Sequence, residues 1–284
     1  MIKEQKDDSG CVKPGIAAIP LLCEAYWESS GISIYNESNL ETMARMPDNY
    51  IDLTVTSPPY DRLRTYNGYS FPFEDIAKEL YRVTKEGGVV VWVVNDATVN
   101  GSETGTSFKQ ALYFKECGFW LYDTMIWKKT GMLPTESRYY NQFEYMFILS
   151  KGKPKTMNFI CDHKTVNGGR KQRKDAVINK GENVKGEGFF IRNEFARRPN
   201  VWEIHIGKSE VKHPAQFPEQ LPADHIITWS NEGDTIYDPF GGSGTTCKMA
   251  YLKNRKTIMS EISSEYCELS KQRLSNHLPK GLFA

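Results

Sequence analysis

The stretch DTIYDPFGGSGTT (234–246) decides the fold of this chain. Its apolar run ends at a proline and three closely spaced glycines, and a helix-like segment opens at the letters GSGTT. A second strand-like run (256–262) and a closing helix-like segment (263–276) follow. Strands that alternate with helices predict a mostly parallel, doubly wound α/β sheet, in which ligands bind at the carboxyl ends of the strands.

The region before this stretch shows the same alternation. Its β-rich runs are separated by helix-like stretches, but the last two runs leave no room for a helix between them. The predicted strands are 51–57, 87–96, 119–129 and 143–152, and the predicted helices are 72–85, 106–117 and 218–230. The expected organisation is an N-terminal arm or helix (1–30), two halves of one α/β domain (31–150 and 199–284) and an insert between them (151–198).

The predicted insert, residues 151–198, has a charge of its own. It holds 13 Lys/Arg against 5 Asp/Glu, a net charge of +8, whereas the remainder holds 23 against 30, a net charge of −7. The whole-chain value of +1 hides this difference, and taken alone it suggests no polyanionic partner. Because the insert also contains many glycines and few regularly spaced apolar residues, we expect a long, loop-rich, functional segment.

Length and composition exclude several classes of protein. With 284 residues, of which 39% are hydrophobic, the chain can bury a full core. Its longest strongly apolar stretch (88–94) is far short of the roughly 20 residues that cross a bilayer, and its first residues lack the apolar core of a signal peptide. We therefore expect a soluble cytoplasmic protein.

The cysteines and histidines predict neither disulfides nor a metal site. The six cysteines form no CxxC pair, so we expect reduced thiols. Cys161 and His163 supply at most two of the four ligands that a structural zinc needs.

The glycine-rich turn predicts a site for an adenosyl group. Glu261, 19 residues beyond Gly242 and at the end of the next predicted strand, is placed to accept hydrogen bonds from a ribose diol. The turn is not a phosphate-binding P-loop, and Cys247 replaces the third glycine of a dinucleotide fingerprint. The alternative is a tight connection that binds no ligand. The expected contacts are Asp238, Pro239, Phe240, Gly241, Gly242, Ser243, Gly244, Thr245 and Glu261.

A second motif, TSPPY (56–60), stands at the carboxyl end of the predicted strand 51–57. Its two prolines cannot extend a central strand, so they stiffen a turn and leave the carbonyl of Pro58 able to accept a hydrogen bond. The hydroxyl of Ser57 and this carbonyl together can hold an NH₂ group, and Tyr60 offers a ring for stacking. The alternative is a rigid turn with a buried tyrosine. The expected catalytic residues are Ser57, Pro58, Pro59 and Tyr60.

TSPPY followed far downstream by DPFGGSGTT closely resembles the amino-methylating DNA methyltransferases of the permuted β group. The resemblance covers roughly residues 32–276 and includes HPAQFPEQL (213–221). It implies a Rossmann-like fold, S-adenosyl-L-methionine as cofactor, and double-stranded DNA as substrate. It also implies a cofactor contact at Gln216 and a target-recognition role for the insert. One departure is that Ser38 stands where the family often has an acid, with Glu37 as a substitute.

The resemblance implies direct methyl transfer to an exocyclic amine. Ser57 and the Pro58 carbonyl would hold the amine of a base that is flipped out of the duplex. Methylation at carbon 5 of cytosine is excluded because it needs a cysteine nucleophile, usually after a proline, and no cysteine here follows one. The basic residues expected to contact DNA are Arg62, Arg64, Arg170, Lys171, Arg173 and Lys174, with ordinary solvated charges as the alternative.

The choice of base stays open between two amines. In this family, serine at the first position of the motif accompanies mainly N4 of cytosine, and aspartate mainly N6 of adenine. We therefore expect a site-specific N4-cytosine methyltransferase of a restriction-modification system, with N6-adenine as the alternative. A catalytically silent nucleic-acid-binding protein of the same fold is a second alternative. A cognate restriction endonuclease and a homodimer are further expectations.

Overall fold

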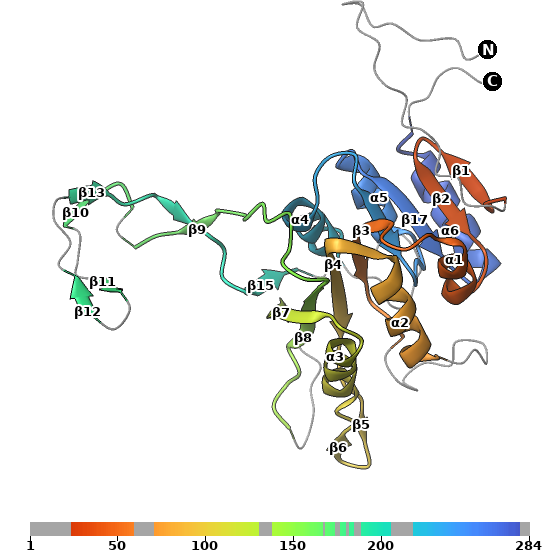
Figure 1. Cartoon of the computed structure of the whole chain (residues 1–284), viewed down its shortest axis with the longest axis horizontal. Helices are drawn as coiled ribbons and strands as arrows, with labels where there is room; N and C mark the ends of the chain where they lie inside the picture. Colours follow the sequence, from red (N-terminus) through yellow and green to blue (C-terminus); the bar gives the residue numbers. More distant parts are fainter. Residues whose placement is uncertain are drawn as a thin grey trace, which may run out of the picture.

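The computed structural model describes residues 24–59, 71–130, 138–166, 168–173, 177–179, 182–184, 189–205 and 218–278, with the backbone alone for those between 172 and 190. A nine-stranded sheet forms its centre (Figure 1). In spatial order the strands are β1 (Trp27–Ser29), β2 (Ile32–Tyr35), β17 (Lys256–Ser260), β16 (Thr235–Asp238), β3 (Ile51–Thr56), β4 (Thr84–Val94), β8 (Phe143–Ser150), β7 (Trp120–Lys129) and β15 (Val201–Ile204).

The sheet is mostly parallel. Only the edge strand β1 and the inner strand β8 run antiparallel to their neighbours. The runs 119–129 and 143–152 are these antiparallel neighbours β7 and β8, which a tight connection can join without a helix. The predicted doubly wound α/β fold is therefore confirmed.

Three helices cover each face of the sheet. The helices α1 (Asn39–Arg45), α2 (Phe73–Val83) and α3 (Thr106–Glu116) pack on one face, and α4 (Gln220–Trp229), α5 (Thr245–Leu252) and α6 (Ser264–Ser275) pack on the other. Strand β4 shows why both faces are covered: Val90 and Trp92 enter one core cluster, and Val91 enters the other. A strand that is buried on both faces needs an unbroken apolar run, which is what GGVVVWVV supplies.

Helix α2 shows how the sequence fixes a covering helix. Its buried residues Ile76, Ala77, Leu80 and Val83 repeat at helical spacing, and its other face is charged. Burying each large apolar side chain contributes roughly 1.5–3 kcal/mol. Among the helices that the structure describes, none is both long enough and apolar enough to cross a membrane.

Several elements were not predicted. Strands β1 and β2, helix α1 and edge strand β15 are short, so their hydrophobic patterns cover too few residues to be recognised. Residues 27–29 of the predicted N-terminal arm form β1, and residues 1–23 lie outside the described part of the chain. The structure also adds a short hairpin after β4, made of β5 (Thr98–Val99) and β6 (Ser102–Glu103).

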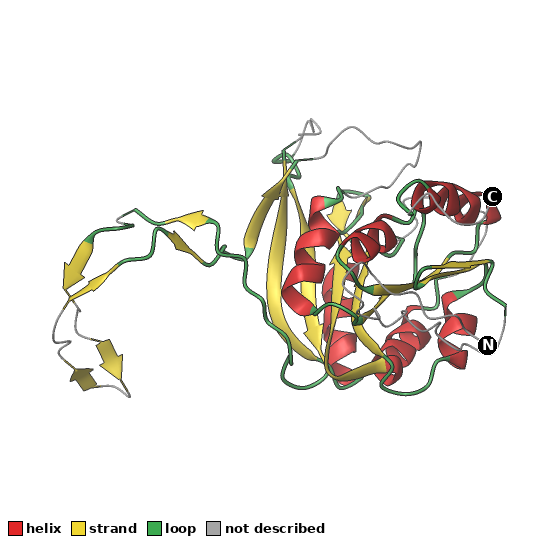
Figure 2. Ribbon diagram, turned by 90° about the horizontal axis from the view of Figure 1, so that it is seen from above, coloured by secondary structure: helices red, strands yellow, loops and turns green. Residues whose placement is uncertain are grey.

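The basic insert contains more regular structure than its glycine content predicts. Three short antiparallel pairs follow one another: β9 (His163–Lys164) with β14 (Phe195–Ala196), β10 (Lys171–Arg173) with β13 (Phe189–Ile191), and β11 (Val177–Asn179) with β12 (Glu182–Val184). Figures 1 and 2 show these pairs extending away from the sheet as a narrow arm. The insert is loop-rich, as predicted, and backbone pairing between its two halves supplies short strands that the sequence did not predict.

Candidate functional site

The two predicted motifs meet at one edge of the sheet. Strand β3 lies between the parallel strands β16 and β4, so their carboxyl ends share an edge, which we call the carboxyl edge. Ser57 directly follows β3, Pro239 follows β16, and Glu261 follows β17. Residues about 180 positions apart in sequence are therefore neighbours in space.

A buried hydrogen bond joins the ends of β3 and β16. The hydroxyl of Thr56 donates to Oδ1 of Asp238 over 2.7 Å, and the backbone N–H of Phe240 donates to the same oxygen over 3.1 Å. Burial raises the pKa of Asp238 to about 6, against the opposing effect of these hydrogen bonds. The hydroxyl of Thr246 donates to the Val55 carbonyl over 3.2 Å and ties the start of α5 to the same strand.

The glycines of the turn are required by packing inside the protein. A Cβ on Gly241 would lie 2.3 Å from Cε and 2.9 Å from Cβ of Met259 on β17. Gly244 is the N-cap of α5 with a φ of 73°, a conformation that favours glycine, and it lies against Ser270. These two glycines let the turn sit directly on β17 and α6.

Glu261 is held at the turn by the backbone on both sides. Its Oε2 accepts from the N–H of Gly242 over 2.8 Å, and its Oε1 accepts from the N–H of Ser263 over 2.9 Å. Burial raises the pKa of this carboxyl, and the backbone hydrogen bonds oppose that rise. The geometry fixes the carboxylate in one orientation, with lone pairs left to accept further hydrogen bonds.

A buried arginine clamps the rear of the turn. Arg273 on α6 donates to the Ser243 carbonyl over 3.2 Å and to the Thr245 hydroxyl over 3.0 Å, and it pairs with Glu219 over 2.5 Å. Lys248 pairs with the same carboxylate over 2.7 Å. Ser243 and Thr245 are both buried, and the Ser243 carbonyl and the Thr245 hydroxyl accept the hydrogen bonds from Arg273, so Arg273 supports the turn from behind.

Two asparagines add hydrogen bonds to the backbone just beyond the ends of β16 and β17. Asn39 on α1 donates to the Pro239 carbonyl over 3.1 Å, and Asn36 donates to the Glu261 carbonyl over 2.9 Å. Neither asparagine was predicted. The only signal for them in the sequence is their place beside a helix-capping pattern.

That capping pattern also explains the departure at Ser38. The Ser38 hydroxyl accepts from the N–H of Leu40, and Glu41 accepts from the N–H of Ser38, which together form a capping box at the start of α1. Glu37 accepts a hydrogen bond from Thr42 over 2.6 Å and forms an ion pair with Arg45. Both residues therefore have a structural partner within α1.

The carboxyl edge has the donors and acceptors that an adenosyl group needs. Phe240, Gly242 and Glu261 are the partly exposed residues of this turn, whereas Asp238, Pro239 and Gly241 are buried. An oriented carboxylate beside exposed backbone is suited to a ribose diol. The residues present fit S-adenosyl-L-methionine, with Glu261 as the side chain that would hold its ribose.

Some predicted site residues lie outside the described part of the chain. These are Tyr60, Arg62, Arg64, Lys174 and Gln216, together with the side chain of Arg173. Ser57 and Pro59 are partly exposed beside the turn, and Pro58 is buried. Arg170 and Lys171 are exposed on the basic insert. Lys171 begins β10, which Figure 1 shows away from the sheet.

The end of the basic insert that joins the sheet, called its root here, is held against α4 by ion pairs and ring contacts of residues that were not predicted as site residues. Arg198 pairs with Asp162 and with the buried Asp224 on α4, and its guanidinium lies 5.0 Å from the ring centre of Trp202. Hydrogen bonds to these two carboxylates raise the pKa of Arg198. His225, also on α4, stacks on Trp202 with ring centres 4.5 Å apart. Because His225 is fully buried, its pKa falls to about 3.

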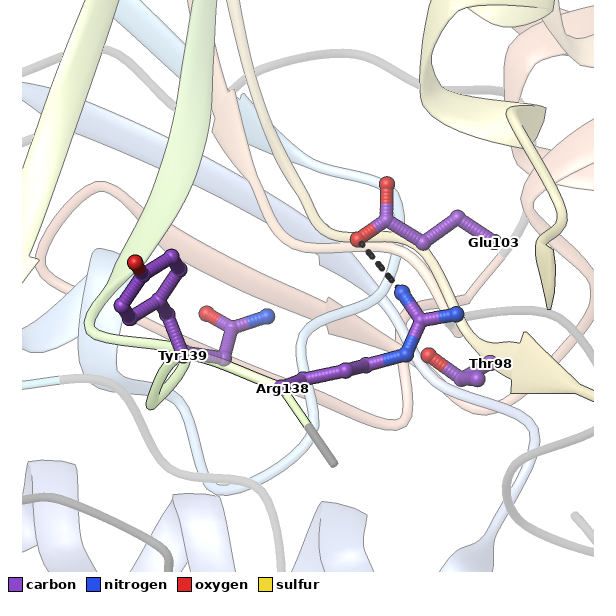
Figure 3. A pocket seen from close by; sticks show the side chains of 5 residues that line it. Thr98, Glu103, Arg138 and Tyr139 are labelled. Atoms are coloured by element: carbon purple, nitrogen blue, oxygen red, sulfur yellow. Dashed lines mark ion pairs between the residues drawn. The ribbon is translucent and has the colours of Figure 1, made fainter. Parts of the chain in front are cut away.

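A hollow of about 370 Å³ lies farther along the carboxyl edge (Figure 3). It is formed between the β5–β6 hairpin and the residues before β8. Its lining residues are Thr98, Glu103, Arg138, Tyr139 and Asn141.

The turn at residues 238–245 is called the cofactor turn below. The fold, the permuted order of the two motifs and this turn together define a class of enzyme. The family model of N6/N4 DNA methylases, described as DNA methylase, matches residues 51–272, so the chain belongs to that family. Its cofactor is S-adenosyl-L-methionine.

Individual relatives are similar over most of the chain. The orphan methyltransferase M.BamHII of Bacillus amyloliquefaciens is 57% identical over 241 residues, which cover 81% of this chain and 91% of that relative. The type II methyltransferase M.BglII of Bacillus subtilis is 26% identical over 260 residues, which cover 85% of this chain and 68% of the relative. The solved PvuII DNA methyltransferase (cytosine-N4-specific) has a TM-score of 0.69 at 22% identity, with 93% and 92% of the two chains covered. At that identity the structural match shows the fold.

Proposed function

We propose that this chain methylates the N4 amine of a flipped cytosine at a specific site in duplex DNA. The observation that carries the proposal is the hydrogen bond between Thr56 and Asp238, which holds Ser57 beside the cofactor turn. A serine in this place can hold the amine while the methyl donor lies against Glu261 and the turn. The reaction then needs no covalent enzyme intermediate.

The catalytic residues act by orienting a poor nucleophile. The lone pair of the exocyclic amine is delocalised into the ring, so the amine must be drawn toward tetrahedral geometry before it can attack. Hydrogen bonds to the Ser57 hydroxyl and the Pro58 carbonyl would achieve this by accepting both amine protons. When bound, S-adenosyl-L-methionine supplies a methyl group activated by a positively charged sulfur.

The serine favours cytosine over adenine. In the family that the motifs resemble, serine in this place accompanies mainly N4 of cytosine, and aspartate, the stronger acceptor for an amine, accompanies mainly N6 of adenine. The solved PvuII methyltransferase, which is cytosine-N4-specific by its name, supports the same choice. Methylation of N6 of adenine is the alternative.

The base reaches the site by flipping out of the duplex. Flipping costs a few kcal/mol, and stacking on Tyr60 together with backbone contacts would offset that cost. We assign the backbone contacts to Arg62 and Arg64, which follow the TSPPY motif in the sequence, and to basic residues of the insert. Arg170 and Lys171 are exposed and suited to this role.

Membership of a restriction-modification system is part of the proposal. M.BglII is named a type II methyltransferase, which supports a partner endonuclease, whereas M.BamHII is named an orphan methyltransferase. A homodimer and a cytoplasmic location stay predictions. Restriction of unmodified DNA by lysates of the source cells would reveal a partner endonuclease.

The decisive experiment is nucleoside mass spectrometry of DNA from cells that express this chain, with sequencing that detects modified bases. We expect N4-methylcytosine in one sequence context. N6-methyladenine in its place would establish the alternative base, and the absence of both would refute methyl transfer to DNA.

A variant separates catalysis from binding. Ser57→Ala should lose turnover and still bind S-adenosyl-L-methionine, because Glu261 and the turn are unchanged. Methylation by this variant at the wild-type rate would refute the role of Ser57. If the wild-type chain binds DNA and cofactor but transfers no methyl group, the catalytically silent alternative is correct.

A further inference from the structure

Tyr139 is a fully exposed aromatic side chain at the carboxyl edge. Its relative exposure is 101%, and the adjacent Tyr140 is 49% exposed. In Figure 3 the Tyr139 ring points away from the ion pair between Arg138 and Glu103. No described residue covers the ring, so it is available to contact a partner.

The segment that carries Tyr139 is held in place by polar contacts on both sides. Arg138 donates to the Gly101 carbonyl and lies 3.8 Å from Glu103, both in the β5–β6 hairpin. Asn95, which follows β4, donates to Oδ1 of Asn141 over 3.4 Å. The ring is therefore presented from a supported segment.

Its place in the sheet puts this ring at the same edge as the catalytic motif. Thr56 on β3 pairs with Trp92 on β4, and Trp92 pairs with Phe147 on β8, the second strand from β3 and roughly 10 Å from it across the sheet. Tyr139 lies eight residues before Phe147, so its segment continues beyond the carboxyl end of β3. The major groove alone is about 12 Å wide, so a duplex that presents a base to Ser57 also covers this part of the edge.

We propose that Tyr139 stacks on a base of the duplex beside the flipped nucleotide, with Arg138 and Asn141 as positioning residues. The proposal rests on the proposed function, because it requires a flipped base. Flipping leaves neighbouring bases unstacked, and an aromatic ring can replace the lost stacking for any base sequence. Stacking on Tyr139 therefore lowers the free-energy cost of flipping the target base and does not select the DNA sequence.

The test compares Tyr139→Ala with Tyr139→Phe, using the recognition duplex found by modified-base sequencing. The duplex carries a fluorescent analogue at the target, either pyrrolocytosine or 2-aminopurine according to the base. We expect Tyr139→Ala to weaken DNA binding and flipping by about 5- to 100-fold, and Tyr139→Phe to retain both within about twofold. Trp120→Ala is the matched control, because Trp120 is 55% exposed but starts β7 at the opposite edge.

A second substrate separates stacking from simple damage to the fold. When the target base faces an abasic site, flipping is already cheap, so Tyr139→Ala should recover most of the wild-type methylation rate. Binding and methylation by Tyr139→Ala within twofold of wild type would overturn the proposal. An equal loss on both substrates would also overturn it, as would a change of oligomeric state with unchanged DNA binding. A wild-type chain that flips and methylates the base, with a flipping signal that Tyr139→Ala leaves unchanged, would refute this inference alone, whereas a wild-type chain that transfers no methyl group would refute the proposed function.

Discussion

The cofactor turn and the basic insert differ in how they are held. In the turn, Asp238, Ser243 and Thr245 are buried, and the side chains of Asp238 and Thr245 are hydrogen-bonded within the protein. The insert has two-stranded pairs and exposed side chains such as Arg170 and Lys171. This difference is what we expect if the turn binds one small cofactor, which needs a site built in advance, and the insert binds a long polyanion, for which charges can stay in solvent until the partner arrives.

The largest effect is expected at the clamp behind the turn. Arg273→Ala removes a buried guanidinium, its ion pair with the partly exposed Glu219 and two charge-assisted hydrogen bonds to the turn, so the free energy of unfolding should fall by about 3–5 kcal/mol. Urea unfolding measures this loss, and calorimetry should show weaker binding of S-adenosyl-L-methionine. The matched control is Arg192→Ala in the exposed insert, which should change stability by less than about 0.5 kcal/mol. Equal losses in the two variants would remove the contrast between the regions.

A smaller effect is expected at the bond between the motifs. Thr56→Val leaves the buried Asp238 without its shortest hydrogen bond and should cost about 1–3 kcal/mol. The turnover number should fall more than the affinity for DNA, because Ser57 directly follows Thr56. Thr56→Ser keeps the hydroxyl and should retain most activity. Thr54→Val on the same strand is the control, because the buried Thr54 hydroxyl has no hydrogen-bond partner.

The pH dependence should have opposite signs in the two regions. The folded protein holds a proton on Asp238 up to a pKa of about 6, above the usual value for an aspartate, so this group lowers stability as the pH rises from about 4 to 6. At the root of the insert, the pKa of His225 falls to about 3, so the unfolded chain binds the proton first and stability rises from about pH 3 to 6.5.

Two variants separate the pH dependence of stability due to Asp238 from that due to His225. Asp238→Asn should make the stability of the protein rise more steeply between pH 4 and 6, and His225→Gln should make it rise less steeply. Urea unfolding at several pH values measures both. Identical profiles of stability against pH for wild type and Asp238→Asn would show that folding does not raise the pKa of Asp238.

Substitutions in the insert should have the smallest effect on stability and a measurable effect on DNA binding. Arg170→Ala and Lys171→Ala should leave unfolding within about 0.5 kcal/mol of wild type. Each should lower the magnitude of the slope of log K for DNA binding against log salt concentration by about 1, the change expected for one lost phosphate contact. Fluorescence anisotropy over a range of salt concentrations measures this slope, while binding of S-adenosyl-L-methionine should respond little to salt. A slope unchanged in both variants would place the phosphate contacts elsewhere.

Long periodic segments of this chain could be predicted, and short ones could not. The run 87–96 and the helix 72–85 appear as β4 and α2 with ends shifted by a few residues. Strand β15 escaped prediction because its four residues are set by pairing with β7, which is remote in sequence. Gly241 was predicted to contact a cofactor, and the structure adds a constraint that the sequence does not show: a Cβ there would overlap Met259, which is remote in sequence.

The sequence by itself determined the alternation of strands and helices, the two motifs, their permuted order and the charge of the insert. These are local properties, fixed by hydrophobic period and by residue type. Only the tertiary structure decided that Thr56 bonds Asp238, that Arg273 supports the turn, and that Tyr139 stands exposed at the carboxyl edge. Each of these depends on which strands become neighbours, and residues far apart in the chain carry no local signal of that pairing.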